Sequence, residues 1–264
     1  MGLTTPRNGI GDGFDVRSLG LSYRDGFTVG EHTHPWGQLV YGIRGMMRVA
    51  AGDAVWFVPP TRAIWLPPGR PHRIVMQGNV AMRTLYVAPG RTIGLRDEAV
   101  ALEVSPLLRE LILHIVTMGM LDPNRVEHDR LAGVLTDLIA EAPPGNLRLL
   151  LPTDPRARAV AEWFQANPHE RRSLDAMTNR TGGSLRTLQR LFARQTGISM
   201  EAWRQKVRLI NAVACLTDGA NVTDAGLACG YDSTSAFIAA FKKQFGVTPG
   251  RYCEVEAVPS GFEM

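Results

Sequence analysis

The stretch of sequence that decides the fold reads Ser173-Leu-Asp-Ala-Met-Thr-Asn-Arg-Thr-Gly-Gly-Ser-Leu-Arg-Thr-Leu-Gln-Arg-Leu-Phe192. A second copy of the pattern reads Val222-Thr-Asp-Ala-Gly-Leu-Ala-Cys-Gly-Tyr-Asp-Ser-Thr-Ser-Ala-Phe-Ile-Ala-Ala-Phe241. Each copy has a short amphipathic segment, then glycine, then a second helical segment. Two helices that cross at a glycine-containing turn form a helix-turn-helix motif. The sequence therefore predicts a tandem helix-turn-helix domain.

The second helix of the first unit has an apolar face and a polar face. Ser184 is expected to cap this helix. The apolar positions recur at helical spacing and are Leu185, Leu188, Leu191 and Phe192. Arginine can donate two hydrogen bonds to guanine and glutamine can pair with adenine, so the polar face suits base reading in the major groove. Its predicted DNA-contacting residues are Arg186, Thr187, Gln189, Arg190 and Arg194.

The second unit carries shorter side chains on its open face. Val222 and Leu227 are expected to be buried, and Phe237 and Phe241 to anchor the second helix. Short hydroxyl side chains suit bonds to phosphate better than extensive base reading. The predicted DNA-contacting residues of this unit are Ser233, Thr234, Ser235 and Lys242. We therefore expect the first unit to dominate sequence choice and the second to add affinity.

A continuous helix is predicted between the two units, from Met200 to Thr217. A rigid helix would hold both readers in successive major grooves, about 34 Å apart. The surrounding region is basic, since residues 154 to 253 carry 14 Lys and Arg against 8 Asp and Glu. Within a chain whose net charge is +4, this uneven distribution indicates a polyanionic partner.

The C-terminal region resembles the DNA-binding domain of the AraC-type transcription regulators. The resemblance rests on Ser173-Leu174, Leu188-Gln-Arg-Leu-Phe192, Thr196-Gly197, Arg208-Leu209, Gly230-Tyr231 and the ending Phe241-Lys-Lys-Gln-Phe-Gly-Val-Thr-Pro-Gly-Arg-Tyr252. It implies that Arg186, Gln189 and Arg190 occupy base-contacting positions. The corresponding positions in the second unit hold Thr234, Ser235 and Ala239. Members of the family commonly join this domain to a cupin-like effector or dimerisation domain.

The N-terminal third alternates short apolar runs with glycine and proline, which is typical of strands. Residues 20 to 90 are expected to form a small antiparallel barrel or jelly roll that closes on itself. The strands expected there are Gln38–Tyr41, Met46–Ala50, Ala54–Val58, Ala63–Leu66, His72–Met76 and Ala81–Val87.

Within this region lies a cluster of histidines. His32 and His34 are two residues apart, so in an extended strand both side chains point to one side. Gln38 follows four residues after His34, and His72 on a later strand is expected to complete the cluster. These four residues are the candidate effector pocket or divalent metal site.

The same residues resemble the two motifs of the cupin fold. His32-Thr-His34 matches the first motif, and Pro67, Gly69 and His72 match the second. Gln38 stands where cupin enzymes place a glutamate, which removes an anionic ligand. Three imidazoles alone can still bind zinc or a similar metal. A metal-free effector pocket, a bound metal and a purely structural role therefore remain open.

Two amphipathic helices are predicted after the strands. Ser105 and Pro106 form a start signal, and Leu107 heads the apolar face of the first helix. The second runs from about residue 124 to residue 141 and places Val134 on its apolar face. These faces are expected either to pack on the barrel or to form a homodimer interface. Ala142-Pro-Pro-Gly-Asn146 is the predicted interdomain hinge.

The length of 264 residues fits two domains joined by a helical region. We expect a cupin-like barrel at 1–100, a helical dimerisation or linker region at 101–145 and the double helix-turn-helix domain at 150–255. The expected fold class is thus α+β and multidomain, with a C-terminal all-α part. The three cysteines lack metal-ligand spacing. Neither a signal peptide nor an apolar run of about 20 residues is seen, which favours a cytoplasmic protein without membrane contact.

These features together predict a sequence-specific transcription regulator that is not an enzyme. The expected partners are promoter DNA, an unknown small-molecule effector, a second copy of the chain and RNA polymerase. The alternative is a metal-dependent cupin enzyme with a DNA-binding appendage. Gln38 argues against this alternative, because the enzyme would need a full ligand set that includes an acid.

Overall fold

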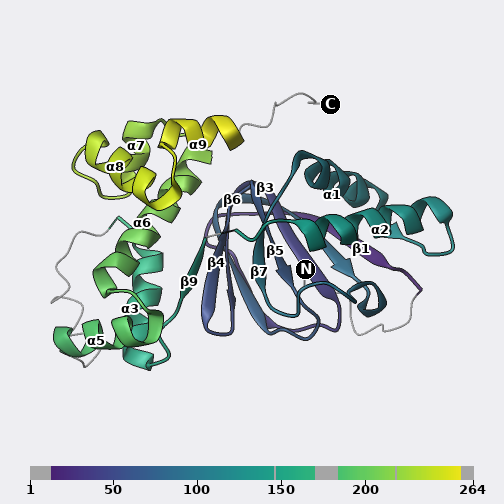
Figure 1. Cartoon of the computed structure of the whole chain (residues 1–264), viewed down its shortest axis with the longest axis horizontal. Coiled ribbons are helices and arrows are strands. Elements are labelled where there is room, and N and C mark those ends of the chain that lie inside the picture. Colours follow the sequence, from purple (N-terminus) through teal and green to yellow (C-terminus); the bar gives the residue numbers. More distant parts are fainter. Residues whose placement is uncertain (1–12, 146, 170–183, 218, 257–264) are drawn as a thin grey trace. The chain divides into compact units, whose positions relative to one another are not determined.

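The computed structural model describes residues 13–145, 147–169, 184–217 and 219–256. The described chain divides into two compact units, Met1–Gly52 with Trp56–Arg148 and Asp53–Val55 with Leu149–Met264. The N-terminal unit is a β sheet with two helices, and the C-terminal unit is helical (Figure 1). The predicted α+β class, β-rich first and helical second, is confirmed.

The sheet is antiparallel, but its hydrogen bonds do not close it into a barrel. Its strands are β1 (Val16–Tyr23), β2 (Thr28–His32), β3 (Gly37–Ala51), β4 (Ala54–Val58), β5 (Arg62–Leu66), β6 (His72–Val87), β7 (Val100–Glu103), β8 (Met120–Leu121) and β9 (Arg148–Leu150). Among the described residues the order is β7-β5-β3-β6-β1-β8; β2 pairs with β6, and β4 pairs with β3 and β9. The expectation of a closed barrel is therefore wrong. The end strands β7 and β8 are short, which limits the exposed edge that closure would otherwise remove.

The centre of the sheet is formed by β3 and β6, each longer than the sequence predicted. Two predicted strands merge in each, because a segment with a positive-φ glycine, Gly45 in β3 and Gly78 in β6, continues the strand instead of ending it. The register of β3 against β6 shifts between Gly42 and Arg44 and again between Arg44 and Met46. Gly45 has φ 72°, and a Cβ there would lie 2.6 Å from the carbonyl oxygen of Asn79. Only glycine fits this bulge without displacing the neighbouring backbone.

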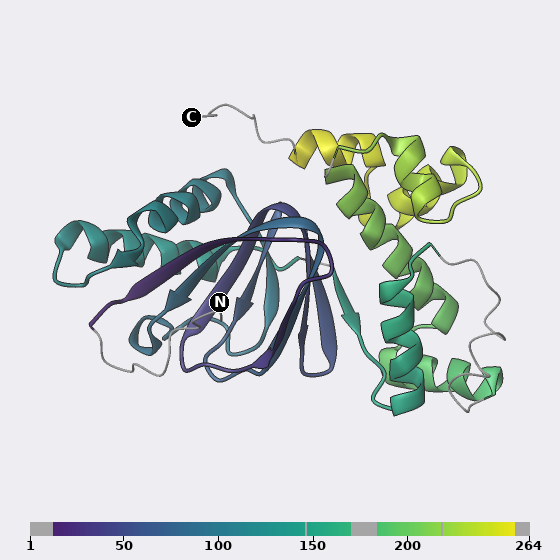
Figure 2. The ribbon, with the colours of Figure 1, turned by 180° about the vertical axis from the view of Figure 1, so that it is seen from behind.

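The helices α1 (Pro106–Met118) and α2 (Val126–Glu141) pack against one face of the sheet (Figures 1 and 2). They share a core with the sheet whose largest contributors are Tyr41, Trp65, Leu85, Ile112, Ile115 and Leu135. Packing of these helices on the sheet, one of the two alternatives, is thus observed. Leu107 and Val134, expected on the apolar faces, are instead 62% and 44% exposed.

Ser105 sets the start of α1. Its hydroxyl oxygen accepts a hydrogen bond from the backbone N–H of Leu108 at 3.2 Å, and Pro106 follows at the first helical position. We expect Ser105→Ala to lower the free energy of unfolding by about 1 kcal/mol, because one N–H at the helix end loses its acceptor. Urea unfolding curves measure this loss. Ser105→Asn keeps an acceptor and is the matched control; equal stability of the alanine and asparagine variants would contradict the assigned role.

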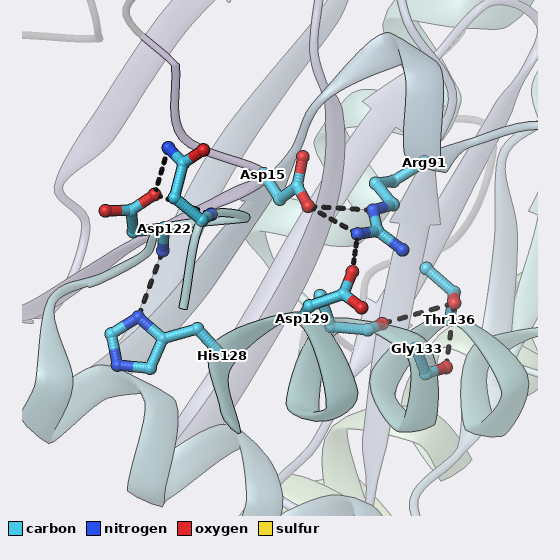
Figure 3. A network of polar contacts seen from close by, with 9 residues as sticks. Asp15, Arg91, Asp122, His128, Asp129, Gly133 and Thr136 are labelled. Atoms are coloured by element: carbon cyan, nitrogen blue, oxygen red, sulfur yellow. Dashed lines mark hydrogen bonds and ion pairs between the residues drawn. The ribbon is translucent and has the colours of Figure 1, made fainter. Parts of the chain in front are cut away.

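Polar contacts join α2 to Asp15, the residue before β1, and to the segment that precedes α2 (Figure 3). Arg91 donates from Nε to Asp15 at 2.8 Å and also pairs with Asp129 on α2. Nδ1 of His128 accepts from the backbone N–H of Asp122 at 3.0 Å. His128 thus has a structural role at the beginning of α2.

The C-terminal unit is organised around one long helix. Its helices are α3 (Pro155–Ala166), α5 (Leu185–Thr196), α6 (Met200–Thr217), α7 (Val222–Ala228), α8 (Thr234–Phe245) and α9 (Pro249–Glu256). The central helix α6 has the predicted bounds and contacts the other five (Figure 1). The first helix predicted for the first helix-turn-helix unit, which begins at Ser173, lies outside the described residues.

Aromatic rings form two groups along α6. Trp203 of α6 lies 5.8 Å from the ring of Phe192 and 6.4 Å from that of Phe164. Phe237 and Phe241 of α8 contact each other at 5.6 Å and are fully buried. Each helix-turn-helix unit therefore has its own buried aromatic group.

In the part of the chain described, every helix is too short or too polar to cross a bilayer.

Candidate functional site

The helix α5 is fixed by its cap and its apolar face. The hydroxyl of Ser184 accepts from the backbone N–H of Thr187 at 3.2 Å, as predicted for the cap. Leu188, Leu191 and Phe192 are buried. The orientation of α5 about its own axis follows from these contacts, because rotating the helix would expose all three apolar side chains.

The opposite face of α5 is exposed and basic. Arg186, Gln189, Arg190 and Arg194 are all exposed. In the described residues, no carboxylate pairs with any of these three guanidinium groups. Thr187 is only half-buried, and its hydroxyl oxygen lies 2.9 Å from that of Ser184. Within the described part of the chain, these four long donor side chains are thus exposed to solvent, where an external anion or base edge could accept from them.

A neighbouring glutamine has a structural role that the sequence did not predict. The side-chain oxygen of Gln195 accepts from the backbone N–H groups of Thr153 and Asp154, both at 3.1 Å. These groups stand at the beginning of α3, where backbone donors lack partners inside the helix. The amide oxygen of Gln195 therefore ties α5 to the beginning of α3.

The second unit uses part of its predicted reader for its own structure. The hydroxyl of Ser233 accepts from the backbone N–H of Ala236 at 3.2 Å and caps α8. The hydroxyl of Thr234 lies 3.2 Å from that of Thr223. Ser235 is exposed. Lys242 is exposed near the opposite end of α8, about two helical turns from Ser235.

The buried positions of α7 also differ from the prediction. Ala225 and Gly226 are buried, whereas Leu227 is 53% exposed. A Cβ on Gly226 would lie 3.0 Å from the ring of Phe237. Close approach of α7 to α8 therefore places the small residues inside, and the prediction that Leu227 is buried is wrong.

The three histidines of the N-terminal sheet meet where β2 and β6 begin to pair. His32 is the last residue of β2 and lies opposite His72, the first residue of β6. His34 lies beyond the strand, so the expected alternation along one strand does not bring it here. The ring centroids are 4.2 Å apart for His32 and His72, 5.2 Å for His34 and His72, and 5.9 Å for His32 and His34. One ligand nitrogen from each ring lies within 4.8 Å of the other two.

Each ring is held by a backbone carbonyl two residues away. Nδ1 lies 2.8 Å from the oxygen of Gly30 in His32, 2.8 Å from that of Trp36 in His34, and 2.9 Å from that of Arg70 in His72. A carbonyl oxygen can only accept, so Nδ1 carries the proton in each ring. The lone pair of each neutral ring is then on Nε2. In His72, which is 1% exposed, Nε2 is buried without a hydrogen-bond partner in the described structure.

Gln38 belongs to the same cluster. Its Oε1 lies 3.0 Å from Nε2 of His34, and its Nε2 donates to the hydroxyl of Thr84 at 2.9 Å. The hydroxyl of Thr84 donates to the carbonyl of Leu39 at 3.2 Å. Thr84 is a buried polar residue that the sequence did not predict. Its local signal is a small hydroxyl side chain directly before the hydrophobic end of β6, Leu85-Tyr-Val87.

Burial favours the uncharged forms of His34, His72 and Tyr86. It lowers the pKa of His72 to about 4 and lowers the pKa of His34, although the hydrogen bonds to Gln38 and Trp36 partly oppose this. Tyr86 stands 5.2 Å from the His34 ring, and burial raises the pKa of its phenol to about 12. His34, His72 and Tyr86 are therefore neutral near pH 7.

The cluster fits a zinc-class ion better than a hard cation. Three neutral imidazoles are good ligands for zinc, nickel or cobalt, whereas magnesium and calcium prefer carboxylate oxygens. The described ligand group contains histidines alone, and Gln38 adds only an uncharged amide. A bound ion would polarise whatever molecule completes its coordination. Among the described residues the ligand group holds no carboxylate, and the arrangement suits binding.

Comparisons with known proteins match each of the two parts of the chain to a known domain family. Residues 18–159 match the family described as AraC-like ligand binding domain, and residues 177–254 match a helix-turn-helix domain. The transcriptional regulator NimR of Escherichia coli is 34% identical over 86% of this chain and 83% of its own length. The regulator RipA of Corynebacterium glutamicum is 32% identical over 46% of this chain and 35% of its own length.

A weaker likeness is seen to the crystal structure of fatty-acid-bound ToxT from Vibrio cholerae. It is 10% identical, covers 92% of this chain and 95% of that chain, and has a TM-score of 0.38. The ligand-binding match spans more than half of the sequence, and the relation to NimR covers most of both chains. The chain therefore belongs to the AraC family of transcriptional regulators, with an effector-binding domain followed by a helix-turn-helix DNA-binding domain.

Proposed function

We propose that this regulator reads promoter DNA in the major groove mainly with Arg186, Thr187, Gln189, Arg190 and Arg194 of α5. The carrying observation is that α5 buries its apolar face and leaves its long donor side chains without carboxylate partners among the described residues. Ser233, Thr234, Ser235 and Lys242 of α8 add affinity through phosphate contacts. The hydroxyls of Ser233 and Thr234 already have partners within the domain, which supports this division of work.

In the N-terminal unit, we assign effector binding to the surroundings of His32, His34, Gln38 and His72. These side chains converge, and a polar group of His72 is buried without a partner in the described chain. An effector controls DNA binding only if it binds one conformation of the protein better than another. The screen described below identifies this molecule and shows whether it strengthens or weakens DNA binding.

We also propose that the chain has three functional regions. Residues 1–100 form the effector domain, 101–145 the helical dimerisation region and 150–255 the DNA-binding domain. Homodimerisation through α1 and α2 is supported by Leu107, Val126 and Val134, which remain exposed after these helices have packed on the sheet.

The regulator works in the cytoplasm, contacts RNA polymerase at the promoter and catalyses no reaction. The absence of a carboxylate from the described histidine cluster supports this last point over the alternative of a cupin enzyme.

The decisive experiment selects DNA for the full-length protein from a random duplex pool and then measures binding by fluorescence anisotropy at moderate salt. We expect one enriched motif whose affinity exceeds that of random competitor by at least about 1000-fold. Failure to prefer any duplex over random competitor would remove the proposed function. A screen for small molecules that change the affinity for the selected duplex then tests effector control.

Lys242 provides a test of the phosphate role of α8. We expect Lys242→Ala to weaken binding to every duplex by the same factor and to reduce the slope of log affinity against log salt by about 1, because one phosphate contact is lost. Anisotropy titrations at several salt concentrations measure both quantities. Lys206→Ala on α6 is the control for loss of one positive charge. A loss confined to one duplex sequence would show that Lys242 contacts a base instead.

A further inference from the structure

We infer that His32, His34 and His72 bind one divalent transition-metal ion of the zinc class, with the amide oxygen of Gln38 as the fourth protein ligand. This deepens the effector role proposed for the N-terminal unit, because it names the chemistry of the ligand. The first support is convergence. One ligand nitrogen from each ring lies within 4.8 Å of the others, and the three rings come from two separate segments of the chain.

The second support is the way the rings are held. Ligating histidines in metal sites usually donate their other N–H to a carbonyl or carboxylate, which fixes the tautomer and the ring orientation. All three rings already do so, to the carbonyls of Gly30, Trp36 and Arg70. The nitrogen that keeps its lone pair in each neutral ring is therefore Nε2, the atom available to bind an ion.

The third support is an arrangement of polar atoms that no proton on a neutral ring can satisfy. His34 faces the Trp36 carbonyl through Nδ1 and the Gln38 amide oxygen through Nε2, so both neighbours are acceptors. A neutral imidazole has one N–H and can satisfy only one of them. A cation between Nε2 of His34 and Oε1 of Gln38 would satisfy both lone pairs. Their separation of 3.0 Å is close to the roughly 3.3 Å expected between two ligands of a tetrahedral zinc ion.

The fourth support comes from His72. Its Nε2 is buried and has no hydrogen-bond partner in the described structure, although buried polar atoms are almost always paired. The hydrogen bonds from Gln38 to Thr84 and from Thr84 to Leu39 hold the amide in place, so that its oxygen faces the rings. A metal ion can accept lone pairs from all these atoms at once, and neutral nitrogen donors select zinc, cobalt or nickel over magnesium.

The test titrates the chelator-treated full-length protein with Co²⁺, follows the visible absorption of the bound ion, and then displaces it with Zn²⁺. We expect one equivalent per chain. His72→Ala should weaken binding more than about 100-fold, because loss of a direct ligand exceeds the effect of an outer-shell partner. His114→Ala is the matched control, since His114 is an exposed histidine on α1 and should bind as the parent does. Equal binding by the two alanine variants would overturn the inference.

A gain-of-affinity variant guards against misfolding of His72→Ala. Gln38→Glu places an anionic oxygen where the amide stands and should raise Zn²⁺ affinity at least about tenfold. Thermal unfolding with and without Zn²⁺ supplies a second measurement, in which the ion should raise the Tm of the parent and of His114→Ala. No increase in affinity for Gln38→Glu would exclude Gln38 as a ligand. Metal binding is measured without DNA, so its failure leaves operator recognition intact, and loss of operator recognition leaves the metal titration intact.

Discussion

Replacing Trp203 with alanine is expected to lower the free energy of unfolding of the C-terminal domain by about 3–5 kcal/mol. The indole is fully buried, and its Nε1 donates to the carbonyl of Leu150 at 2.8 Å. Its ring contacts Phe164 of α3 and Phe192 of α5. Alanine would leave a cavity between three helices and an unpaired carbonyl oxygen, and both effects destabilise. Phe192 packs against Trp203 and thereby fixes α5, the helix proposed to read DNA. DNA binding should therefore fall for every duplex sequence.

Urea unfolding followed by far-ultraviolet circular dichroism measures the stability, and anisotropy measures DNA binding. Trp163→Ala is the matched control, since this second tryptophan of the domain is only half-buried and should cost less. Trp203→Phe keeps most of the apolar volume but cannot donate to Leu150, so it separates packing from the hydrogen bond. A loss of less than about 1 kcal/mol in Trp203→Ala would show that α3, α5 and α6 are held together by other contacts.

The helical half was largely predictable because its signals are local. The bounds of α6, Met200–Thr217, agree with the prediction, and Ser105 and Ser184 cap the helices that follow them. Capping and helical periodicity act within a few residues of one another, so one sequence is enough to detect them. Exposure was less predictable. Leu107 and Leu227 have apolar side chains at helical spacing, but the neighbouring helices and sheet cover other positions.

The sheet was less predictable because strand pairing is non-local. β1 pairs along its whole length with β6, more than 50 residues later in the chain. Its sequence mixes serine, arginine and glycine with apolar residues, so it has no clear strand signal. The sequence predicts an interruption of the strand at Gly45, because it does not show that Asn79 approaches this glycine closely.

The sequence predicts the histidine cluster, but the reason it provides is incomplete. The motif spacing brought His32, His34 and His72 together in the prediction, and their rings do meet. The structural cause is the pairing of β2 with β6, which sets His32 opposite His72, and not alternation from His32 to His34 along one strand. Thr84, which orients Gln38, lies 46 residues from it in the sequence, and such a contact leaves no local signal.

Arg190→Ala is expected to weaken binding to the selected duplex by about 1–3 kcal/mol, or roughly 5- to 150-fold. Arg190 is exposed on α5, one helical turn from Arg186, and has no carboxylate partner among the described residues. Both guanidinium groups are therefore available to base edges on the same face. The loss should be confined to one base pair. At that position, the parent protein should discriminate between bases, and the variant should bind all four duplexes alike.

Anisotropy titrations of the parent and the variant against four duplexes that differ at each position provide this measurement. Arg251→Ala is the control for an exposed arginine of the same domain outside α5 and α8, and it should retain the parent's preference. Arg190→Lys adds a sharper comparison, because lysine keeps the charge but lacks the planar pair of donors that guanine accepts. If Arg190→Ala weakens binding to every duplex alike and Arg190→Lys restores the affinity, the side chain contacts phosphate, and base reading belongs to Arg186 and Gln189. If Arg190→Lys restores affinity without preference, the guanidinium of Arg190 reads a base directly.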